Sequence, residues 1–358
     1  MTSPFDPLTF AHGPAMANRI MLAPLTNMQS NADGTLGEDE YHWLVKHAEG
    51  GFGLINTCAA HVQACGIGFP GQLGIFSDDH LPGLTRLAAG IKAQGCLSAV
   101  QLHHAGLRTP ADLIEGVPVG PFAEPDTDCH VLTTAEVEQL RDDFIAAAVR
   151  AERAGFDGVE VHGAHGYVLC QFLDPVNNLR DDRYGGSYEN RTRIIHEVLD
   201  GIRAATHSDF RLGIRLSPER FNIDLAEAKQ FAQELMTGGV IDYVDMSLWD
   251  CFSMPSDEAY ADRPLIEHFT SLERGQCRLG VAGKIMDAET VRKCLDTGAD
   301  FVLIGKAAIL HHDFPRLVRA DSDFVPIATP VTRAHLAAEG LGPTFIGYMS
   351  NWPGFIEG

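Results

Sequence analysis

Two histidines and a tyrosine lie close together in the segment His162-Gly-Ala-His165-Gly-Tyr167. Two imidazoles at this spacing can bind a metal ion if a third ligand joins them, and Cys170 or Asp174 could supply that ligand. The imidazoles can instead donate hydrogen bonds to an oxygen on which charge develops, while the phenol acts as a general acid. Isolated His-x-x-His pairs are also often structural. The segment alone leaves these three roles open.

Other polar side chains stand near the ends of β-rich runs, where a barrel core would be apolar. Thr26 follows the first run, and Gln101 lies in the third, before His103 and His104. Arg215 lies in the fifth run. Hydroxyl, amide, imidazole and guanidinium groups that converge on one edge of a fold predict a ligand site. We expect His103 and His104 to be structural.

Two Gly-Lys pairs, Gly283-Lys284 and Gly305-Lys306, follow the last two β-rich runs, and each stands just before a predicted helix. Glycine lets the backbone approach an anion closely, and the N–H groups at a helix start favour phosphate. Loops after the last two strands of a barrel often form such a site. The two pairs therefore predict a phosphate site with lysine counter-charges.

The elements that must position these side chains alternate along the chain. Eight short β-rich runs are predicted strands, at 19–22, 54–57, 97–102, 158–162, 211–216, 243–247, 279–282 and 301–304. The clearest helical patterns cover 134–154, 190–206, 224–237 and 287–297, and Thr133 and Glu136 can form a capping box before the first of them. Strand and helix in alternation indicate an α/β fold, a single (β/α)8 TIM barrel. An open doubly wound sheet is the alternative, but a GxGxxG turn does not follow the first run.

We expect residues 1–358 to form one domain with loop inserts at about 103–133 and 163–189 and a C-terminal tail after about 314. In such a barrel the chemistry lies at the C-terminal ends of the strands, which is where the polar residues above fall. Trp249, just past the sixth run, is either a wall of the substrate pocket or a packing aromatic.

The composition limits the partners. The chain has 48 acidic and 27 basic residues and a formal net charge of −21, which argues against a nucleic-acid partner. No apolar run approaches the roughly 18 residues of a membrane span, and the start lacks the basic region of a secretory signal. The eight cysteines are scattered and predict reduced thiols in a cytoplasmic protein. We therefore expect a small-molecule substrate.

A longer segment downstream, from Asn178 to Arg191, contains Tyr184-Gly-Gly-Ser187. Together with the His-x-x-His-x-Tyr segment, it resembles the signature of the Old Yellow Enzyme family of FMN-dependent ene-reductases. The resemblance covers nearly the whole barrel and includes the segments 18–20, 23–26 and 74–80.

The resemblance implies FMN as the cofactor and NADPH or NADH as the reductant. It implies hydride transfer to the β-carbon of an α,β-unsaturated carbonyl compound, with His162 and His165 donating to the carbonyl oxygen and Tyr167 supplying the proton. The expected cofactor-binding residues are Pro24, Leu25, Thr26, Ala59, Gln101, Arg215, Gly283, Lys284, Gly305 and Lys306. Trp249 is the remaining expected substrate contact.

Two positions depart from the family pattern. An arginine usually follows the glycine of the third-strand motif directly, but here Leu107 intervenes before Arg108, and Lys306 stands where arginine is commoner. Three alternatives remain: a member that reduces dienoyl or nitro compounds, a metal-dependent TIM-barrel enzyme, and a flavin-binding module without redox activity. Barrels of this type commonly self-associate, which leaves a homo-oligomer possible.

Overall fold

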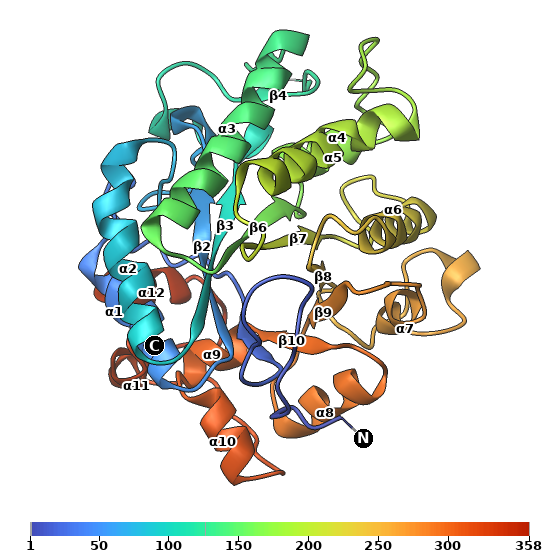
Figure 1. Ribbon diagram of the computed structural model, residues 1–358. Helices are drawn as coiled ribbons and strands as arrows, with labels where there is room; N and C mark the ends of the chain where they lie inside the picture. The colour runs from blue at the N-terminus through green and yellow to red at the C-terminus, as the bar shows by residue number, and fades with distance from the viewer. Residues whose placement is uncertain (1, 126, 358) are drawn as a thin grey trace.

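The computed structural model describes residues 2–125 and 127–357 (Figure 1). Parallel strands form a closed barrel in the order β1-β10-β9-β8-β7-β6-β3-β2. These strands are β1 (Ile20–Leu22), β2 (Leu54–His61), β3 (Leu97–His103), β6 (Gly158–Gly163), β7 (Arg211–Leu216), β8 (Tyr243–Ser247), β9 (Arg278–Ala282) and β10 (Phe301–Ile304). The predicted TIM barrel is confirmed, and the open sheet is excluded.

Helices surround the barrel, as Figure 1 shows. They are α1 (Glu38–Glu49), α2 (Leu81–Ala93), α3 (Thr134–Ala154), α4 (Val168–Leu173), α5 (Tyr188–Ala205), α6 (Leu225–Thr237), α7 (Leu265–Thr270), α8 (Ala288–Asp296), α9 (Lys306–Leu310), α10 (Phe314–Ala320), α11 (Arg333–Ala338) and α12 (Pro343–Met349). Helix α3 has the predicted bounds, and its capping box is present. Thr133 Oγ1 accepts the Glu136 N–H at 3.3 Å, while the Glu136 carboxylate accepts the Thr133 N–H at 2.7 Å.

Strand β2 differs most from its predicted bounds, because it continues four residues past Thr57, to His61. A bulge between Asn56 and Ala59 interrupts its pairing with β3. Within the bulge, the Thr57 hydroxyl donates to the carbonyl of Cys58 at 2.7 Å. Beyond it, Ala59 pairs with Gln101, so these two residues lie side by side at the end of the barrel.

The N-terminal segment closes the other end of the barrel. Phe10 makes edge-to-face contacts with Tyr243 and Phe301 at centroid distances of 6.1 and 6.2 Å. These two residues begin β8 and β10, and the guanidinium of Arg211, which begins β7, lies 4.3 Å above the Phe10 ring. In Figure 1 this blue segment crosses in front of the strands. The N-terminal ends of the strands are thus covered, and the C-terminal ends are left for a site.

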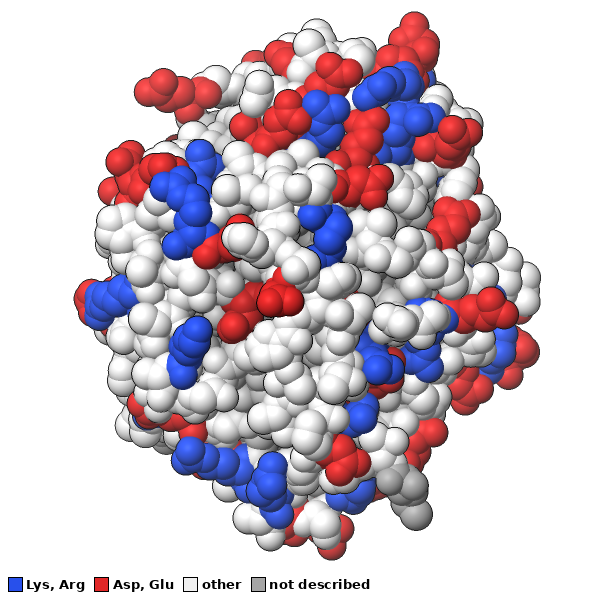
Figure 2. Space-filling model, in the orientation of Figure 1, with Lys and Arg blue, Asp and Glu red and all other residues white. Residues whose placement is uncertain are grey.

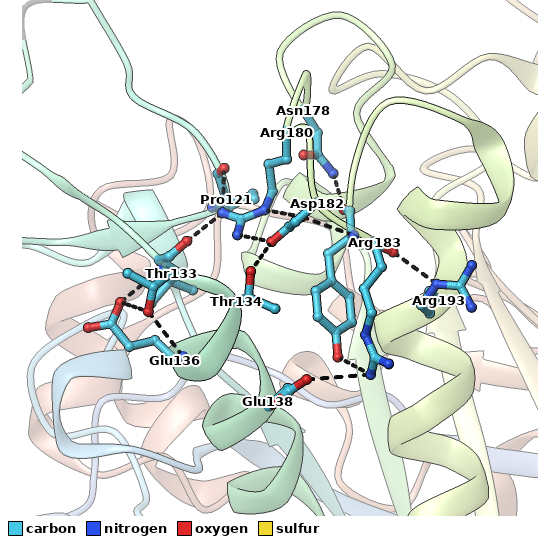
Figure 3. Close-up of polar contacts among 12 residues, drawn as sticks. Pro121, Thr133, Thr134, Glu136, Glu138, Asn178, Arg180, Asp182, Arg183 and Arg193 are labelled. Carbon is cyan, nitrogen blue, oxygen red and sulfur yellow. Dashed lines mark hydrogen bonds and ion pairs between the residues drawn. The ribbon is translucent and has the colours of Figure 1, made fainter.

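The two loop inserts are joined to each other by Arg180 (Figure 3). Its guanidinium donates to the carbonyls of Pro121, at 3.2 Å, and Leu132, and it pairs with Asp182 at 2.5 Å. Asp182 also accepts the Thr134 hydroxyl at 2.7 Å, which ties the insert to the start of α3. The first insert contains two short strands, β4 (Val119–Gly120) and β5 (His130–Val131), that the sequence analysis missed. The charged side chains of the second insert therefore hold the loop.

Acidic and basic side chains are interspersed over the face of the molecule shown in Figure 2. No helix in the described part of the chain combines the length and the apolar character needed to cross a membrane. Six cysteines are buried among apolar side chains and serve as packing residues, namely Cys58, Cys96, Cys170, Cys251, Cys277 and Cys294.

Candidate active site

A cavity of about 570 Å³ opens at the C-terminal ends of the barrel strands. The predicted site residues that line it are Pro24, Leu25, Thr26, Ala59, Gln101, His162, His165, Tyr167, Arg215 and Trp249. An adjoining cavity of about 190 Å³ is lined by Gly283, Lys284, Gly305 and Lys306. Because Leu25, His165 and Arg215 line both cavities, the structure brings all the predicted site residues into one continuous site.

The two predicted imidazoles contact each other. His162 lies near the end of β6, and His165 follows in the next loop with a left-handed φ of 60°. His165 Nδ1 lies 3.2 Å from His162 Nε2, and His165 Nε2 lies 2.8 Å from the Ser247 hydroxyl. Burial, with the added repulsion of Arg215, lowers the pKa of both histidines well below the ordinary value. Both imidazoles are therefore neutral near pH 7.

The hydrogen-bond partners assign the protons of this pair. The backbone N–H of Ala164 donates to His162 Nδ1 at 3.3 Å. A neutral imidazole carries one proton, so that of His162 lies on Nε2 and points to His165 Nδ1. His165 then carries its proton on Nε2 and donates it to Ser247. Since a hydroxyl can rotate from acceptor to donor, Ser247 can also stabilise the other tautomer, in which His165 Nδ1–H faces the cavity.

Tyr167 lies directly before α4, against the histidines. Its ring centroid is 4.3 Å from that of His103 and 5.1 Å from that of His162. The guanidinium of Arg108 lies 4.6 Å above the Tyr167 ring. Burial raises the pKa of the Tyr167 phenol, although Arg108 opposes this shift. The phenol is therefore protonated at neutral pH and can act as a general acid.

His103 and His104 contact other protein groups rather than the cavity. Both are buried, and neither lines the cavity. His103 Nδ1 lies 3.0 Å from Gln72 Nε2, which also donates to the carbonyl of Ala59 at 2.9 Å. His104 Nδ1 accepts the N–H of Gly106 at 2.9 Å. These contacts hold the loops beneath the site in place.

A buried carboxylate orients the amide of Gln101. Gln101 Nε2 donates to Glu160 Oε1 at 2.8 Å, and Asn56 Nδ2 donates to Glu160 Oε2 at 3.0 Å. An amide nitrogen carries two protons, so Gln101 retains one N–H and its carbonyl oxygen for a ligand. Glu160 is fully buried, and this burial raises its pKa even though Arg215 opposes the shift.

Arg215 is fixed from below by β8. Its Nε lies 3.2 Å from Asp245 Oδ2, and one terminal nitrogen donates to Ser247 at 3.3 Å. Burial raises the pKa of Asp245 to about 8, against the attraction of Arg215. The guanidinium therefore reaches the cavity floor in a position set by two side chains of one strand.

The smaller cavity differs in one respect from the sequence expectation. Lys306 is exposed, with its ammonium 5.3 Å from the Phe355 ring, but the ammonium of Lys284 pairs with Asp250 at 3.0 Å. Gly283 has a φ of 154°, and a Cβ there would lie 2.9 Å from the Asp250 nitrogen. Only glycine lets these two loops approach so closely.

The sequence analysis missed a large part of the lining. The additional residues are Phe69, Arg108, Arg220, Phe221, Ile309, Phe345, Tyr348, Met349 and Trp352. Helix α12 and the turn after it supply the last four, so the C-terminal tail forms one wall of the cavity. A short amphipathic helix far along the chain carries no local signal of such a role.

The segment Arg220-Phe221-Asn222, after β7, has an uncommon backbone conformation. All three residues have left-handed φ values, of 71°, 54° and 60°. Such conformations in residues other than glycine cost about 1–3 kcal/mol each and occur preferentially at functional sites. Asn adopts this conformation readily, but Arg and Phe rarely do, which explains why the sequence analysis overlooked the segment.

The alternative of a metal site at the histidine pair lacks a third ligand. Within residues 2–125 and 127–357, ligand atoms of His, Cys, Asp or Glu converge in a group of three only at His312, Asp313 and Glu339. None of these residues lines either cavity. Asp174, one of the two proposed third ligands, instead accepts hydrogen bonds from Asn177 and Asn222.

Comparisons with known proteins find relatives over most of the chain. The model of the NADH:flavin oxidoreductase / NADH oxidase family matches residues 3–322. A probable NADH-dependent flavin oxidoreductase of Bacillus subtilis is 34% identical, over 86% of this chain and 85% of its own length. An NADPH dehydrogenase of the same organism is 31% identical, over 87% of this chain and 93% of its own length. The solved old yellow enzyme homologue from Zymomonas mobilis superposes with a TM-score of 0.79 at 27% identity, over 94% of this chain and 96% of that one.

Proposed function

The chain belongs to the Old Yellow Enzyme family of NADH:flavin oxidoreductases, and we propose that it reduces alkenes conjugated to a carbonyl group. It is an NAD(P)H-dependent flavin oxidoreductase with FMN as its cofactor. When bound, FMN supplies two-electron hydride chemistry. The observation that carries the proposal is the pair of neutral imidazoles beside a protonated phenol, which all line one cavity.

The residues of the two cavities fit an FMN molecule. Gln101 has an unused N–H and a carbonyl oxygen for the polar edge of a flavin, and Arg215 supplies a positive charge beside them. We propose that these two residues and Thr26 hold the polar edge, while the ring system is lined by Pro24, Leu25 and Ala59.

The smaller cavity fits the phosphate end of the same molecule. Gly283 and Gly305 leave backbone room there, and we propose that Lys306 is the main counter-charge. Lys284 is assigned a weaker role, because its ammonium already pairs with Asp250.

His162 and His165 are proposed to bind the carbonyl oxygen of the substrate. Negative charge develops on this oxygen as the alkene is reduced, and two N–H donors fixed in advance stabilise such charge strongly. His162 supplies Nε2–H, and His165 supplies Nδ1–H once Ser247 donates to its Nε2. Because the imidazoles are neutral, they act as hydrogen-bond donors rather than as acids.

Tyr167 is proposed to donate the proton that completes the reduction at the α-carbon. The phenol is protonated at neutral pH, so it has a proton to give to the carbanion-like centre that develops at the α-carbon. The guanidinium of Arg108 above the ring stabilises the phenolate that remains.

Product analysis tests the proposal. The purified protein with NADPH or NADH should convert 2-cyclohexenone into cyclohexanone, identified by gas chromatography. Consumption of the nicotinamide without any saturated product, with this enone and with maleimide, would contradict the proposed activity on alkenes.

A further inference from the structure

The side chains that line the larger cavity are basic, whereas the chain as a whole is acidic. The protein carries a formal net charge of −21, yet among the described residues no Asp or Glu lines either cavity. Three arginines line the larger one, namely Arg108, Arg215 and Arg220. A basic cavity in an acidic protein attracts anions and steers them inward.

Two of these arginines have no carboxylate partner among residues 2–125 and 127–357. Arg215 differs from the other two, because its Nε lies 3.2 Å from Asp245 Oδ2. Arg108 and Arg220 make no ion pair with any residue in the described ranges, although many arginines of this chain do. Their charge is therefore available to a ligand.

Aromatic rings and a carbonyl group hold both guanidiniums at the cavity. Arg108 lies over the Tyr167 ring and donates to the carbonyl oxygen of His165. The guanidinium of Arg220 lies 4.4 Å above the Trp249 ring, which is itself 5.8 Å from the ring of His165. A guanidinium stacked on a ring keeps its N–H edge free for bidentate contact with a carboxylate or a phosphate.

The loop that carries Arg220 is firmly anchored in its left-handed conformation. Asn222 donates to Asp174 at 2.9 Å, and Phe221 packs so closely that a Cβ on Gly166 would lie 2.7 Å from its ring. The neighbouring acid, Glu219, accepts two hydrogen bonds from Ser256, at 2.8 and 2.9 Å. The loop thus presents a cation to the cavity while its own carboxylate is engaged elsewhere.

We propose that Arg108 and Arg220 bind a negatively charged group of the molecule seated at His162 and His165. The preferred alkene substrates then carry a carboxylate in addition to the activating carbonyl group. This inference rests on the proposed function, because it names the substrate class of the same site. A phosphate of the nicotinamide dinucleotide offers the same chemistry, and the experiment must separate the two sources.

The experiment compares an acid with its neutral ester. The probes are (E)-4-oxopent-2-enoate and its methyl ester, and the variants are Arg108→Gln and Arg220→Gln. We expect the wild-type enzyme to favour the acid in kcat/KM. Each variant should lower the acid-to-ester ratio by about tenfold or more, since a charge-assisted hydrogen bond is lost. Raised ionic strength should lower the wild-type ratio as well.

Arg319→Gln is the matched control. Arg319 is also exposed and also lies over an aromatic ring, at 4.3 Å from the centroid of Phe5, but it lines neither cavity. Its replacement changes the net charge equally and should leave the ratio unaltered. A ratio near one in the wild type, or a preference that survives in both cavity variants, would overturn the inference while ene-reduction stands.

Two further outcomes are decisive. If the variants instead raise KM for NADPH or NADH at an unchanged acid-to-ester ratio, the anion is the dinucleotide phosphate, and the assignment to the substrate is wrong. If neither enone reacts, the proposed function fails, and ligand binding decides the inference. Absorbance titration of the holoprotein with 4-hydroxybenzoate and its methyl ester should then show tighter binding of the acid, and equal affinity would overturn the inference.

Discussion

His165 Nε2 lies 2.8 Å from the hydroxyl oxygen of Ser247, on the neighbouring barrel strand β8. Because this hydroxyl can accept or donate, it permits either tautomer of His165 and so decides which nitrogen can donate into the cavity. The same hydroxyl also accepts from Arg215 at 3.3 Å. Ser247 therefore couples the imidazole pair to the cation on the cavity floor.

Replacing Ser247 with alanine should weaken ligand binding at the histidine pair. The change removes the donor that stabilises the Nδ1–H tautomer of His165. We expect the dissociation constant of a phenol ligand to rise about tenfold, because the loss of one hydrogen bond weakens binding by about this factor. Absorbance titration of the holoprotein measures this constant. Ser247→Thr keeps the hydroxyl and should retain most of the affinity, and equal losses in both variants would contradict the role of the hydroxyl.

Replacing Tyr167 with phenylalanine should affect only one half of the reaction. Loss of a general acid costs about 10²- to 10⁴-fold, so reoxidation of the reduced enzyme by an enone should slow by a factor in this range. Reduction by NADPH or NADH should stay within a few-fold of wild type. Rapid-mixing absorbance measures the two steps separately, and equal slowing of both would remove the acid assignment.

Because His104 is buried, we expect the free energy of unfolding to fall at acidic pH. Burial lowers the pKa of His104 to about 3, and its Nδ1 must stay unprotonated to accept the Gly106 N–H. The unfolded value is near 6.5, so its stabilising effect is complete above that pH and is lost as the pH falls toward the folded pKa.

His104→Asn keeps an acceptor for Gly106 but cannot titrate. Below pH 6.5, we expect the free energy of unfolding of this variant to depend less steeply on pH. The slope should fall by up to about 1.4 kcal/mol per pH unit, which is the slope that a difference of one bound proton produces. Urea unfolding at a series of pH values measures this slope. A slope equal to that of the wild type would contradict the prediction.

Arg180 should matter for stability rather than for chemistry. It joins the two loop inserts through Asp182 and two backbone carbonyls, and its side chain is only 9% exposed (Figure 3). Arg180→Ala leaves a partly buried carboxylate without its partner, so we expect a loss of about 2–3 kcal/mol. Thermal unfolding checks this. As a control, Arg153→Ala, which breaks an exposed pair with Asp78, should cost less than about 1 kcal/mol.

The sequence predicted the barrel because its strands are short, β-rich and separated by helical patterns. The bounds of β7, β8, β10 and α3 agree with the prediction, and for α3 the capping box marks the start. Such signals are local and arise from hydrogen bonds and periodicity within one element.

The missed features depend on contacts between distant segments. The bulge in β2, the left-handed conformation of Arg220 and the contribution of α12 to the cavity wall all require the assembled fold. The residue types at these positions also occur in ordinary strands, loops and helices. The site residues found from the sequence came from their resemblance to a family and from polar groups at strand ends.

The most direct test of the account is an anaerobic absorbance experiment on the purified holoprotein. Addition of NADPH or NADH should bleach the flavin bands, and subsequent addition of 2-cyclohexenone should restore them in the wild type and far more slowly in Tyr167→Phe. Flavin bands that bleach but are not restored by the enone, or are restored equally fast without Tyr167, would contradict the proposed chemistry of this site.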